Sequence, residues 1–421
     1  MSFFSTTYDI VIVGGGISGL FLAYKLSETN LEVLLLEKDK NLGGRIHTSV
    51  DKDIQYECGA GRFNEKHEKL ISLIHELKLE ENMFPLTKGN ELKIRDYNTS
   101  TPLNSVYLFD MVKNKYPEYD TPYLQKITFY QLITDMFDSE TANYMRDALG
   151  YDAEFMQLNA HSAYTMFKDD LFDDTLYYVL KGGLSQIMNK MESLLKRKQN
   201  VTILKNNELK KIYDDKILTS IDTYSYKNLV LAIPQYNLKK LSEFNDFKLL
   251  DSVEPIELLR IYATYPVDEQ GNPWFKDIKR TTTDNYIRHI IPIDYSKGLI
   301  MISYTDSLNA KLLANLHSVS EDKLMEGIHK EIKVLFDIEP PKPKKVYFHY
   351  WNDGYTGLHV WKTGNDIDEI YPKILQPDTE KNIFICGETY SKKQGWIEGA
   401  LETSYDVLKK LNFEDVDISV N

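Results

Sequence analysis

The feature that most constrains this chain is a block near its start in which an apolar run, a glycine turn and a helix-like run follow one another. Residues 8–13 (YDIVIV) are rich in β-branched side chains, and residues 14–19 (GGGISG) supply the turn. Residues 20–26 (LFLAYKL) have helical apolar spacing, and a second apolar run at residues 31–36 ends directly before Glu37. This order of strand, turn, helix and strand predicts a βαβ unit with parallel strands.

The glycine spacing within this unit predicts a dinucleotide site. Gly14 permits a tight turn, Gly16 lets the backbone approach a diphosphate without an intervening Cβ, and Gly19 allows close packing of helix on strand. The free N–H groups of the helix start face the diphosphate. Glu37, at the tip of the second strand, can accept hydrogen bonds from ribose hydroxyls and disfavours a 2′-phosphate. The alternative is a βαβ unit that is purely structural.

Length and charge exclude several other classes of protein. A chain of 421 residues is too long for one ordinary core and suits two or three domains. Its net charge of −13, without a basic stripe, argues against a nucleic-acid partner. Cys58 and Cys386 imply no disulfide framework, and the N-terminal apolar stretch is broken by glycines. We therefore expect a cytoplasmic protein with no membrane-spanning segment and no metal site.

Three further motifs narrow the cofactor. Gly43-Gly44-Arg45 follows the βαβ unit, and Gly387-Glu388 and residues 395–400 (GWIEGA) stand near the other end of the chain. With these motifs the chain resembles the flavin-containing amine oxidase superfamily over nearly its whole length. The resemblance implies FAD, with Arg45 at the diphosphate and flavin edge and Glu388 at the ribityl and diphosphate region. It places Trp396 and Ile397 under the flavin.

The mode of flavin attachment is implied in the same way. Monoamine oxidases join the flavin covalently to a cysteine in the region that here spans residues 351–357, and no cysteine is present there. We therefore expect FAD to bind non-covalently.

The same resemblance implies the architecture, an α/β fold with a Rossmann-type FAD-binding domain, a mixed-sheet substrate domain and an inserted helical lobe. The expected segments are 1–65 (FAD-binding domain), 66–180 (helical lobe and part of the substrate domain), 181–250 (FAD-binding domain), 251–364 (substrate domain) and 365–421 (FAD-binding domain).

The region around Arg62 indicates the substrate. Residues 59–67 (GAGRFNEKH), followed by a predicted helix, resemble L-amino acid oxidases more closely than amine-specific relatives. The resemblance implies that Arg62 binds the substrate α-carboxylate, which suits a planar guanidinium with two parallel donors. Tyr304, at the end of a predicted strand, would assist it. The alternatives are that Arg62 pairs with Glu57 or a cofactor phosphate, and that Tyr304 only packs.

The substrate domain also carries the main departure from the family pattern. Residues 252–264 align with the strand on which relatives carry a lysine that faces flavin N5, and the aligned position here is Arg260. Arginine keeps the positive charge but cannot deprotonate, which places oxygen reactivity in question. A slip of one residue would put Leu259 there. We expect the backbone carbonyl of Gly395 to accept from the substrate amine and Trp396 to wall the cavity.

These inferences give one set of expected site residues. Arg260 is the expected catalytic residue, and the substrate would be bound by Arg62, Tyr304, Gly395 and Trp396. The expected cofactor-binding residues are Gly14, Gly16, Ile17, Ser18, Gly19, Glu37, Lys38, Gly44, Arg45, Gly59, Ala60, Gly61, Arg62, Leu209, Gly387, Glu388, Gly395, Trp396 and Ile397.

The expected reaction is FAD-dependent oxidative deamination of a primary amine that bears a carboxylate, with an L-amino acid as the expected substrate and molecular oxygen as acceptor. Its products are a 2-oxo acid, ammonia and hydrogen peroxide. Two alternatives stay open. One is an amine or polyamine oxidase, and the other is a flavin-dependent dehydrogenase or redox module with poor oxygen reactivity because of Arg260. We expect the helical lobe with His289 or Trp361 to form the pocket for the substrate side chain. We also expect a homodimer, because dimers are the commonest oligomers.

Overall fold

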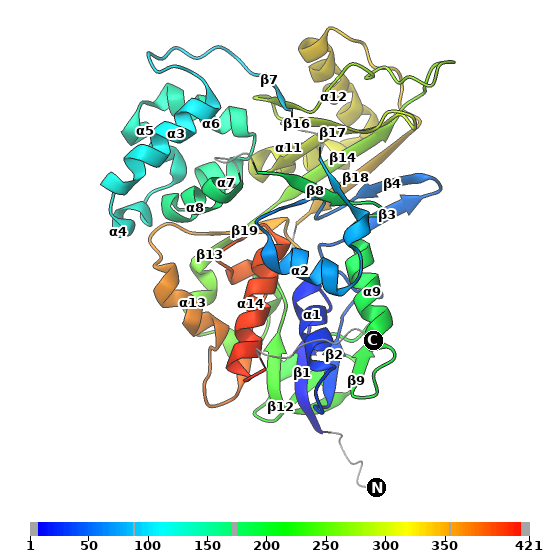
Figure 1. Ribbon diagram of the computed structural model, residues 1–421, viewed down its shortest axis with the longest axis vertical. Helices are drawn as coiled ribbons and strands as arrows, with labels where there is room; N and C mark the ends of the chain where they lie inside the picture. Colours follow the sequence, from blue (N-terminus) through cyan, green and yellow to red (C-terminus); the bar gives the residue numbers. More distant parts are fainter. Residues whose placement is uncertain (1–6, 87–88, 171–174, 353–354, 414–421) are drawn as a thin grey trace.

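The computed structural model describes residues 7–86, 89–170, 175–352 and 355–413, and its lower half is built on a largely parallel sheet (Figure 1). The parallel strands run in the order β20-β12-β1-β2-β9. Their bounds are β1 Thr7–Val13, β2 Val33–Leu36, β9 Val201–Leu204, β12 Thr223–Leu231 and β20 Ile383–Ile385. An antiparallel hairpin, β10 (Leu209–Ile212) and β11 (Lys216–Thr219), extends the sheet beside the first half of β12.

The second half of strand β1, Ile10 to Val13, is apolar and buried because both faces of the sheet are covered there. Ile10 and Ile12 pack into one hydrophobic cluster, whereas Val11 and Val13 pack into another on the opposite face. The first cluster includes side chains of helices α1, α2, α9 and α14, and the second includes side chains of α10 and α13. Their bounds are α1 Ile17–Leu26, α2 Glu68–Glu76, α9 Ser185–Leu195, α10 Gln235–Leu238, α13 Ile367–Leu375 and α14 Ile397–Lys410.

A second, mainly antiparallel sheet forms the upper half of the molecule (Figure 1). Its strand order is β18-β14-β17-β16-β15-β7, with bounds β18 Lys345–Trp351, β14 Leu258–Thr264, β17 Leu299–Asp306, β16 His289–Asp294, β15 Thr281–Thr283 and β7 Glu91–Lys93. Helices α11 (Ser307–Val319) and α12 (Glu321–Phe336) pack on one face of it. Arg260 on β14 lies directly opposite Tyr304 on β17.

The remaining elements are a helical lobe and three small strand pairings. The lobe comprises α3 Ser105–Lys115, α4 Thr121–Leu124, α5 Phe129–Met136, α6 Ser139–Leu149, α7 Asp152–Met156 and α8 Ala160–Asp170. The small pairings are β3 (Thr48–Asp51) with β4 (Ile54–Glu57), β5 (Phe63–Asn64) and β6 (Met83–Pro85) with β8 (Tyr177–Leu180), and β13 (Val253–Ile256) with β19 (Leu358–Trp361). The exact segment boundaries expected from the sequence remain predictions.

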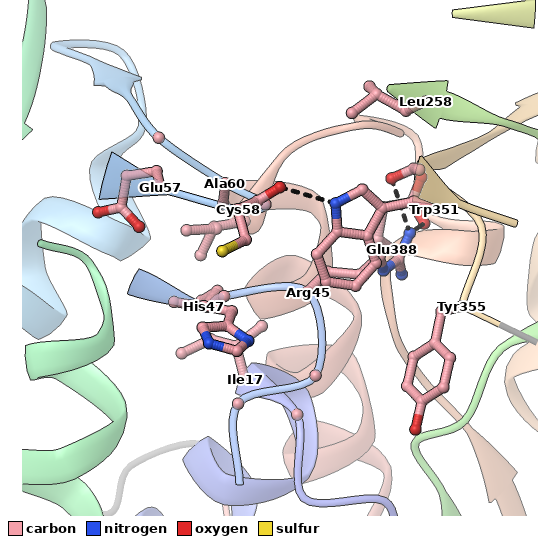
Figure 2. Close-up of a pocket in the computed structure, with 18 of the residues that line it drawn as sticks. Ile17, Arg45, His47, Glu57, Cys58, Ala60, Leu258, Trp351, Tyr355 and Glu388 are labelled. Carbon is pink, nitrogen blue, oxygen red and sulfur yellow. Dashed lines mark hydrogen bonds and ion pairs between the residues drawn. The ribbon is translucent and has the colours of Figure 1, made fainter. Parts of the chain in front are cut away.

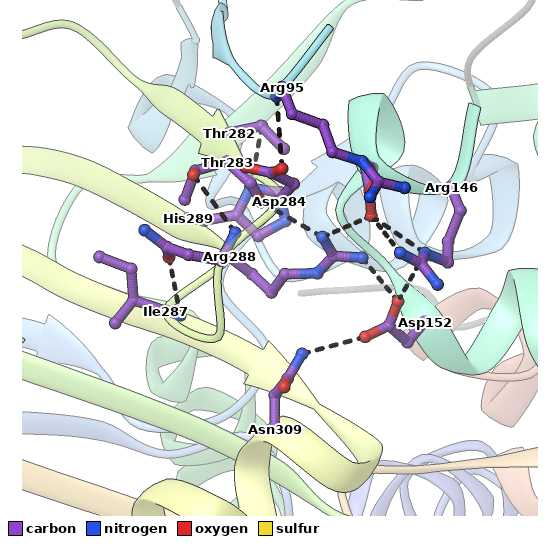
Figure 3. A network of polar contacts seen from close by, with 12 residues as sticks. Arg95, Arg146, Asp152, Thr282, Thr283, Asp284, Ile287, Arg288, His289 and Asn309 are labelled. Atoms are coloured by element: carbon purple, nitrogen blue, oxygen red, sulfur yellow. Dashed lines mark hydrogen bonds and ion pairs between the residues drawn. The ribbon is translucent and has the colours of Figure 1, made fainter. Parts of the chain in front are cut away.

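A buried ionic network fixes the lobe to the second sheet (Figure 3). Arg288, which is 2% exposed, donates to Asp147 at 2.9 Å and to Asp152 at 2.6 Å. Asn309, on α11, donates to the other oxygen of Asp152 at 3.1 Å. Breaking such a buried pair from one side is costly, because the remaining charge is left without a partner. The network therefore holds the start of α7, and with it Tyr151, at a defined place against the sheet.

Cys58 and Cys386 are free and buried. Among the described residues, no helix is both long and apolar enough to cross a membrane.

Candidate functional site

One continuous cavity of about 2060 Å³ runs from the glycine turn after β1 to the upper sheet. Ordinary small-ligand pockets occupy roughly 300–1,000 Å³, so this cavity has room for a large cofactor together with a substrate. Its walls come from both sheets and from helix α7, and they contain nearly all of the expected site residues, Gly19 being the exception.

The glycine turn has the geometry that a diphosphate requires. Gly14 has φ +108°, and a Cβ there would lie 2.3 Å from the carbonyl oxygen of Ala232. A Cβ at Gly19 would lie 2.0 Å from the carbonyl oxygen of Gly14, so this glycine serves close packing. A Cβ at Gly16, in contrast, would meet no heavy atom within 4 Å, and Gly16 lines the cavity. The open space beside Gly16 and the start of α1 fit a bound phosphate group.

Glu37 lies at the tip of β2, as the sequence predicts, and its carboxylate braces the turn. One oxygen accepts from the N–H of Gly15 at 2.7 Å and the other from the N–H of Asp39 at 2.9 Å. Burial raises the pKa of Glu37, and these two hydrogen bonds only partly oppose the rise. The neighbouring Lys38 places its ammonium 4.0 Å from the ring centre of Tyr355. The contact of Glu37 with a ribose remains a prediction.

Arg45 and Glu388 form an ion pair between segments that are far apart in the chain (Figure 2). Arg45 Nη1 donates to Glu388 Oε2 at 2.6 Å. The other carboxylate oxygen accepts from the backbone N–H groups of His359 at 2.9 Å and Gly395 at 2.8 Å. Burial alone would raise the pKa of Glu388, but Arg45 and then His359 outweigh it and hold this pKa well below its ordinary value. Glu388 therefore joins three segments of the cavity wall as an anion.

Trp351 is a wall residue that the sequence analysis did not single out. Its indole N–H donates to the carbonyl oxygen of Cys58 at 2.7 Å (Figure 2). A Cβ at Gly59 would lie 1.9 Å from the carbonyl oxygen of Arg45 and 3.2 Å from the ring of Trp351, so only glycine fits there. Gly59, Ala60 and Gly44 also line the cavity. No sequence motif marked Trp351, because its role depends on β18 lying beside this loop.

Arg62 lines the cavity and lies among tyrosines. Its Nη2 donates to the hydroxyl oxygen of Tyr151 at 2.8 Å, and its guanidinium lies 4.8 Å from the ring centre of Tyr177. The carboxylate of Glu57 instead accepts from the N–H of Leu184 and the hydroxyl of Thr48. Within the described part of the chain, no carboxylate forms an ion pair with Arg62.

Arg260 and Tyr304 face the same cavity from neighbouring strands. The guanidinium of Arg260 lies 4.7 Å from the ring centre of Tyr304, and its Nη1 donates to the carbonyl oxygen of Glu57 at 3.2 Å. A Cβ at Gly61 would lie 3.1 Å from Arg260 Nη1, so the side chain lies against the loop that carries Arg62. Leu259 is fully buried in the core under the second sheet.

Arg280 is a second site residue that sequence reasoning missed. It directly precedes β15 and lines the cavity, and its Nη2 lies 3.5 Å from the same Tyr151 hydroxyl that Arg62 contacts. Its Nε is buried and has no hydrogen-bond partner. Burial, and secondly the positive charge of Arg62, lowers the pKa of Arg280. No motif marked it, because only the fold brings the start of β15 to Arg62.

The aromatic end of the cavity is formed where α14 begins. Trp396 directly precedes this helix, and its ring lies edge-on to His67 at 4.8 Å and tilted to Tyr177 at 6.3 Å. Gly395 has φ +79° and is held through its N–H by Glu388. Burial lowers the pKa of His67 to about 3, so this imidazole is neutral at ordinary pH.

The other expected cofactor residues take the following places. Ile17 and Ser18 start α1, Leu209 starts β10, Gly387 follows β20 and Ile397 starts α14, and all of them line the cavity.

The expectation that His289 or Trp361 lines the side-chain pocket is wrong. Trp361 is fully buried, and its indole N–H donates to the carbonyl oxygen of Ser391. His289 is 1% exposed and packs behind the rings of Tyr151 and Tyr304. Both side chains are therefore part of the core instead of the cavity wall, whereas Arg280 and Tyr151 do line the cavity.

Comparison with known proteins identifies the family of the chain. Residues 12–77 match an NAD(P)-binding Rossmann-like domain, and residues 125–407 match the family described as flavin containing amine oxidoreductase. The chain belongs to the flavin containing amine oxidoreductases, and its cofactor is accordingly a flavin.

Several individual proteins resemble the chain. Achacin from Lissachatina fulica is 22% identical to this chain, and the alignment covers 96% of this chain and 93% of achacin. The L-amino-acid oxidase of Mus musculus is 36% identical over 116 residues, which are 27% of this chain and 17% of that protein. A structure of putrescine oxidase bound to putrescine superposes with a TM-score of 0.76 at 17% identity, covering 97% of this chain and 99% of the other. At that identity the likeness shows a shared fold.

Proposed function

We propose that the protein is an L-amino acid oxidase that holds FAD non-covalently. The observation that carries this proposal is Arg62, a guanidinium on the cavity wall whose neighbours are tyrosines. Within the described residues no carboxylate neutralises it, so its charge is available to an anionic substrate group. A carboxylate accepts two parallel N–H donors from arginine and gains more from this in a water-poor cavity than at a surface. The partial likeness to an L-amino-acid oxidase supports the same assignment.

The residues around the cavity would orient the substrate and favour its reactive form. Arg62 would bind the α-carboxylate, with Tyr304 beside it and Trp396 as a wall. Burial and the positive charges of Arg62 and Arg260 disfavour a substrate ammonium, so the bound amine loses a proton readily. The carbonyl oxygen of Gly395 would accept from the neutral amine. No protein base is needed for this step, because positioning and desolvation supply much of the acceleration.

The reaction balances as follows. Loss of the Cα hydrogen with its electron pair and of one N–H proton gives an imino acid. Water adds to the imine carbon and ammonia leaves, which yields the 2-oxo acid. The chemistry that a bound flavin supplies is acceptance of two electrons and their return to dioxygen as hydrogen peroxide.

A second candidate function, oxidation of an amine or polyamine, rests on two carboxylates that also line the cavity, Glu154 and Asp306. A cationic substrate would seek such groups. Burial, and then the neighbouring Glu154 and Asp152, raise the pKa of Asp306 well above its ordinary value, so this carboxyl group ionises less readily than an exposed one. The raised pKa of Asp306 favours the amino-acid assignment. A flavin-dependent dehydrogenase that reacts poorly with oxygen remains the further alternative because of Arg260.

Peroxide release from a panel of substrates tests the assignment. The purified flavoprotein is incubated in air with individual L-amino acids, with putrescine and with spermidine, and peroxide is measured. The proposal expects peroxide with one or more L-amino acids and a negligible rate with both polyamines. Activity on the polyamines alone would overturn it. If an amino acid bleaches the flavin under anaerobic conditions and air restores the yellow colour only slowly, the protein is a dehydrogenase. The cytoplasmic location and the homodimer stay predictions.

A further inference from the structure

Two guanidinium groups converge on one hydroxyl in the substrate end of the cavity. The hydroxyl oxygen of Tyr151 accepts a hydrogen bond from Arg62 Nη2 at 2.8 Å, and it lies 3.5 Å from Arg280 Nη2. The distance between the two Nη2 atoms therefore cannot exceed the sum of these two distances. The arginines come from different parts of the fold, Arg62 from the loop before β5 and Arg280 from the start of β15. Tyr151 is held in place because Asp152, the next residue, belongs to the buried network with Arg288 (Figure 3).

This arrangement is unfavourable without an anion. Two like charges in a poorly solvated cavity repel each other and lose hydration. Within the described residues neither arginine forms an ion pair with a carboxylate, and Arg280 Nε is buried without a partner. Tyrosine hydroxyls and ring faces are weak substitutes for a counterion. The protein therefore holds the positive charges of Arg62 and Arg280 a short distance apart on a cavity wall, with no carboxylate among the described residues paired to either.

We infer that the preferred substrates are dicarboxylic α-amino acids, of the aspartate and glutamate class, whose side-chain carboxylate binds Arg280 while the α-carboxylate binds Arg62. The inference rests on the proposed function and names its substrate class. The two guanidinium groups that meet at the Tyr151 hydroxyl offer one partner to each of two carboxylates. The short separation of the guanidinium groups suits a dicarboxylate with few intervening carbons. A site that holds buried charged donors also rejects ligands that leave such a donor unpaired, so neutral amino acids are discriminated against.

The competing arrangement is a single carboxylate held by both arginines. The two arrangements differ in what removal of Arg280 does. If both guanidinium groups hold one carboxylate, Arg280→Met weakens every carboxylate ligand alike. If Arg280 binds the side-chain carboxylate, the substitution weakens the binding of dicarboxylates selectively.

The test uses unreactive probes first, so that it does not depend on oxidation. Binding of glutarate and of butyrate to the flavin-loaded protein is measured by calorimetric titration. Wild type should bind glutarate about 10- to 100-fold more tightly than butyrate, the range of one charge-assisted hydrogen-bonding group. Arg280→Met should remove this preference and change butyrate affinity by less than about twofold. Arg280→Lys, which keeps the charge, should retain part of the preference.

The matched control is Arg197→Met, which removes an exposed arginine after α9 and should leave both affinities unchanged. In catalysis, the ratio of kcat/KM for L-glutamate or L-aspartate to that for L-leucine should fall in Arg280→Met by the same 10- to 100-fold, about the value of one such group. Equal weakening of glutarate and butyrate, or an unchanged glutarate affinity, would overturn the inference.

Failure of the proposed function has a different signature. If glutarate binds through Arg280 but no L-amino acid is oxidised, the arginine pair stands as a dicarboxylate site and the oxidase assignment fails. If neutral L-amino acids are oxidised and glutarate binds no better than butyrate, the oxidase assignment stands and the dicarboxylate inference fails.

Discussion

Replacement of Glu388 by glutamine should destabilise the protein at neutral pH by about 3 kcal/mol. Removing one partner of a buried ion pair costs about 3–5 kcal/mol. The lower end applies here because the Arg45 side chain keeps 25% of its surface exposed and stays partly solvated, whereas Glu388 keeps 6%. An amide would preserve an acceptor for the N–H groups of His359 and Gly395 but would present no charge to Arg45.

The pH dependence of this loss has a defined sign. Arg45 and His359 overcome the effect of burial and depress the pKa of Glu388 in the folded protein below its ordinary value of 4.5. A carboxylate with a depressed pKa contributes stability that is fully present above its unfolded pKa and is lost as pH falls toward the folded one. The difference between wild type and Glu388→Gln should therefore be constant above about pH 5 and should shrink below about pH 4.5.

Glu398 provides the matched control. It is also buried and accepts two backbone hydrogen bonds, from Lys69 and Leu70 at 2.9 Å each, but burial raises its pKa. Glu398→Gln should therefore cost less at neutral pH, and its effect should become more favourable as pH rises. Urea unfolding of each variant at pH 7 and pH 4 measures these differences. Equal stability of wild type and Glu388→Gln at pH 7, or a gap that widens in acid, would refute the reasoning.

Three further predictions follow from the site. Gly16→Ala should keep the unfolding free energy of the flavin-free protein within about 0.5 kcal/mol of wild type, because its Cβ enters open space, but it should lower the flavin content of the purified protein. Gly19→Ala should destabilise the protein strongly, because its Cβ would meet the Gly14 carbonyl oxygen. Burial lowers the pKa of His67 to about 3 in the folded protein, whereas in the unfolded chain this side chain takes up a proton near pH 6.5. The unfolding free energy of wild type should therefore fall by about 2 kcal/mol between pH 8 and pH 5 because of His67. In urea unfolding measured across this pH range, His67→Gln should show a flatter slope. Arg260→Lys should speed reoxidation by air, measured by stopped flow, without slowing anaerobic reduction of the flavin; unchanged reoxidation would remove Arg260 as the cause of any slow oxygen reaction.

The shape of the glycine turn at one end of the cavity could be predicted from sequence because its determinants are local. The turn at Gly14, the open position at Gly16 and the carboxylate of Glu37 belong to one continuous βαβ unit. The two glycines answer backbone requirements that spacing reveals, whereas spacing gives no sign that Glu37 accepts from the N–H groups of Gly15 and Asp39. The motifs also located Arg45 and Glu388, but they gave no sign that the two side chains bond to each other, because 343 positions separate them.

The substrate end could be predicted only in part, because it is assembled from segments that meet through tertiary packing. Arg280 follows no recognisable pattern, and its nearness to Arg62 depends on how β15 and the helical lobe come together around Tyr151. The same dependence explains the error at Trp361, which is expected at the side-chain pocket whereas the fold places it in the core. Side-chain type alone does not separate a buried aromatic residue from a lining one.

The amino-acid assignment depends on a cavity that binds the anionic end of its substrate. The most direct measurement is an anaerobic titration of the flavin absorbance of wild type and Arg62→Met with an L-amino acid and with the amine that lacks its carboxylate. If Arg62 binds the carboxylate, the amino acid should bleach wild-type flavin at a concentration about 100-fold lower than the amine does, and Arg62→Met should abolish this difference. Equal responses to the two compounds in wild type, or a preference for the amino acid that survives in Arg62→Met, would contradict it.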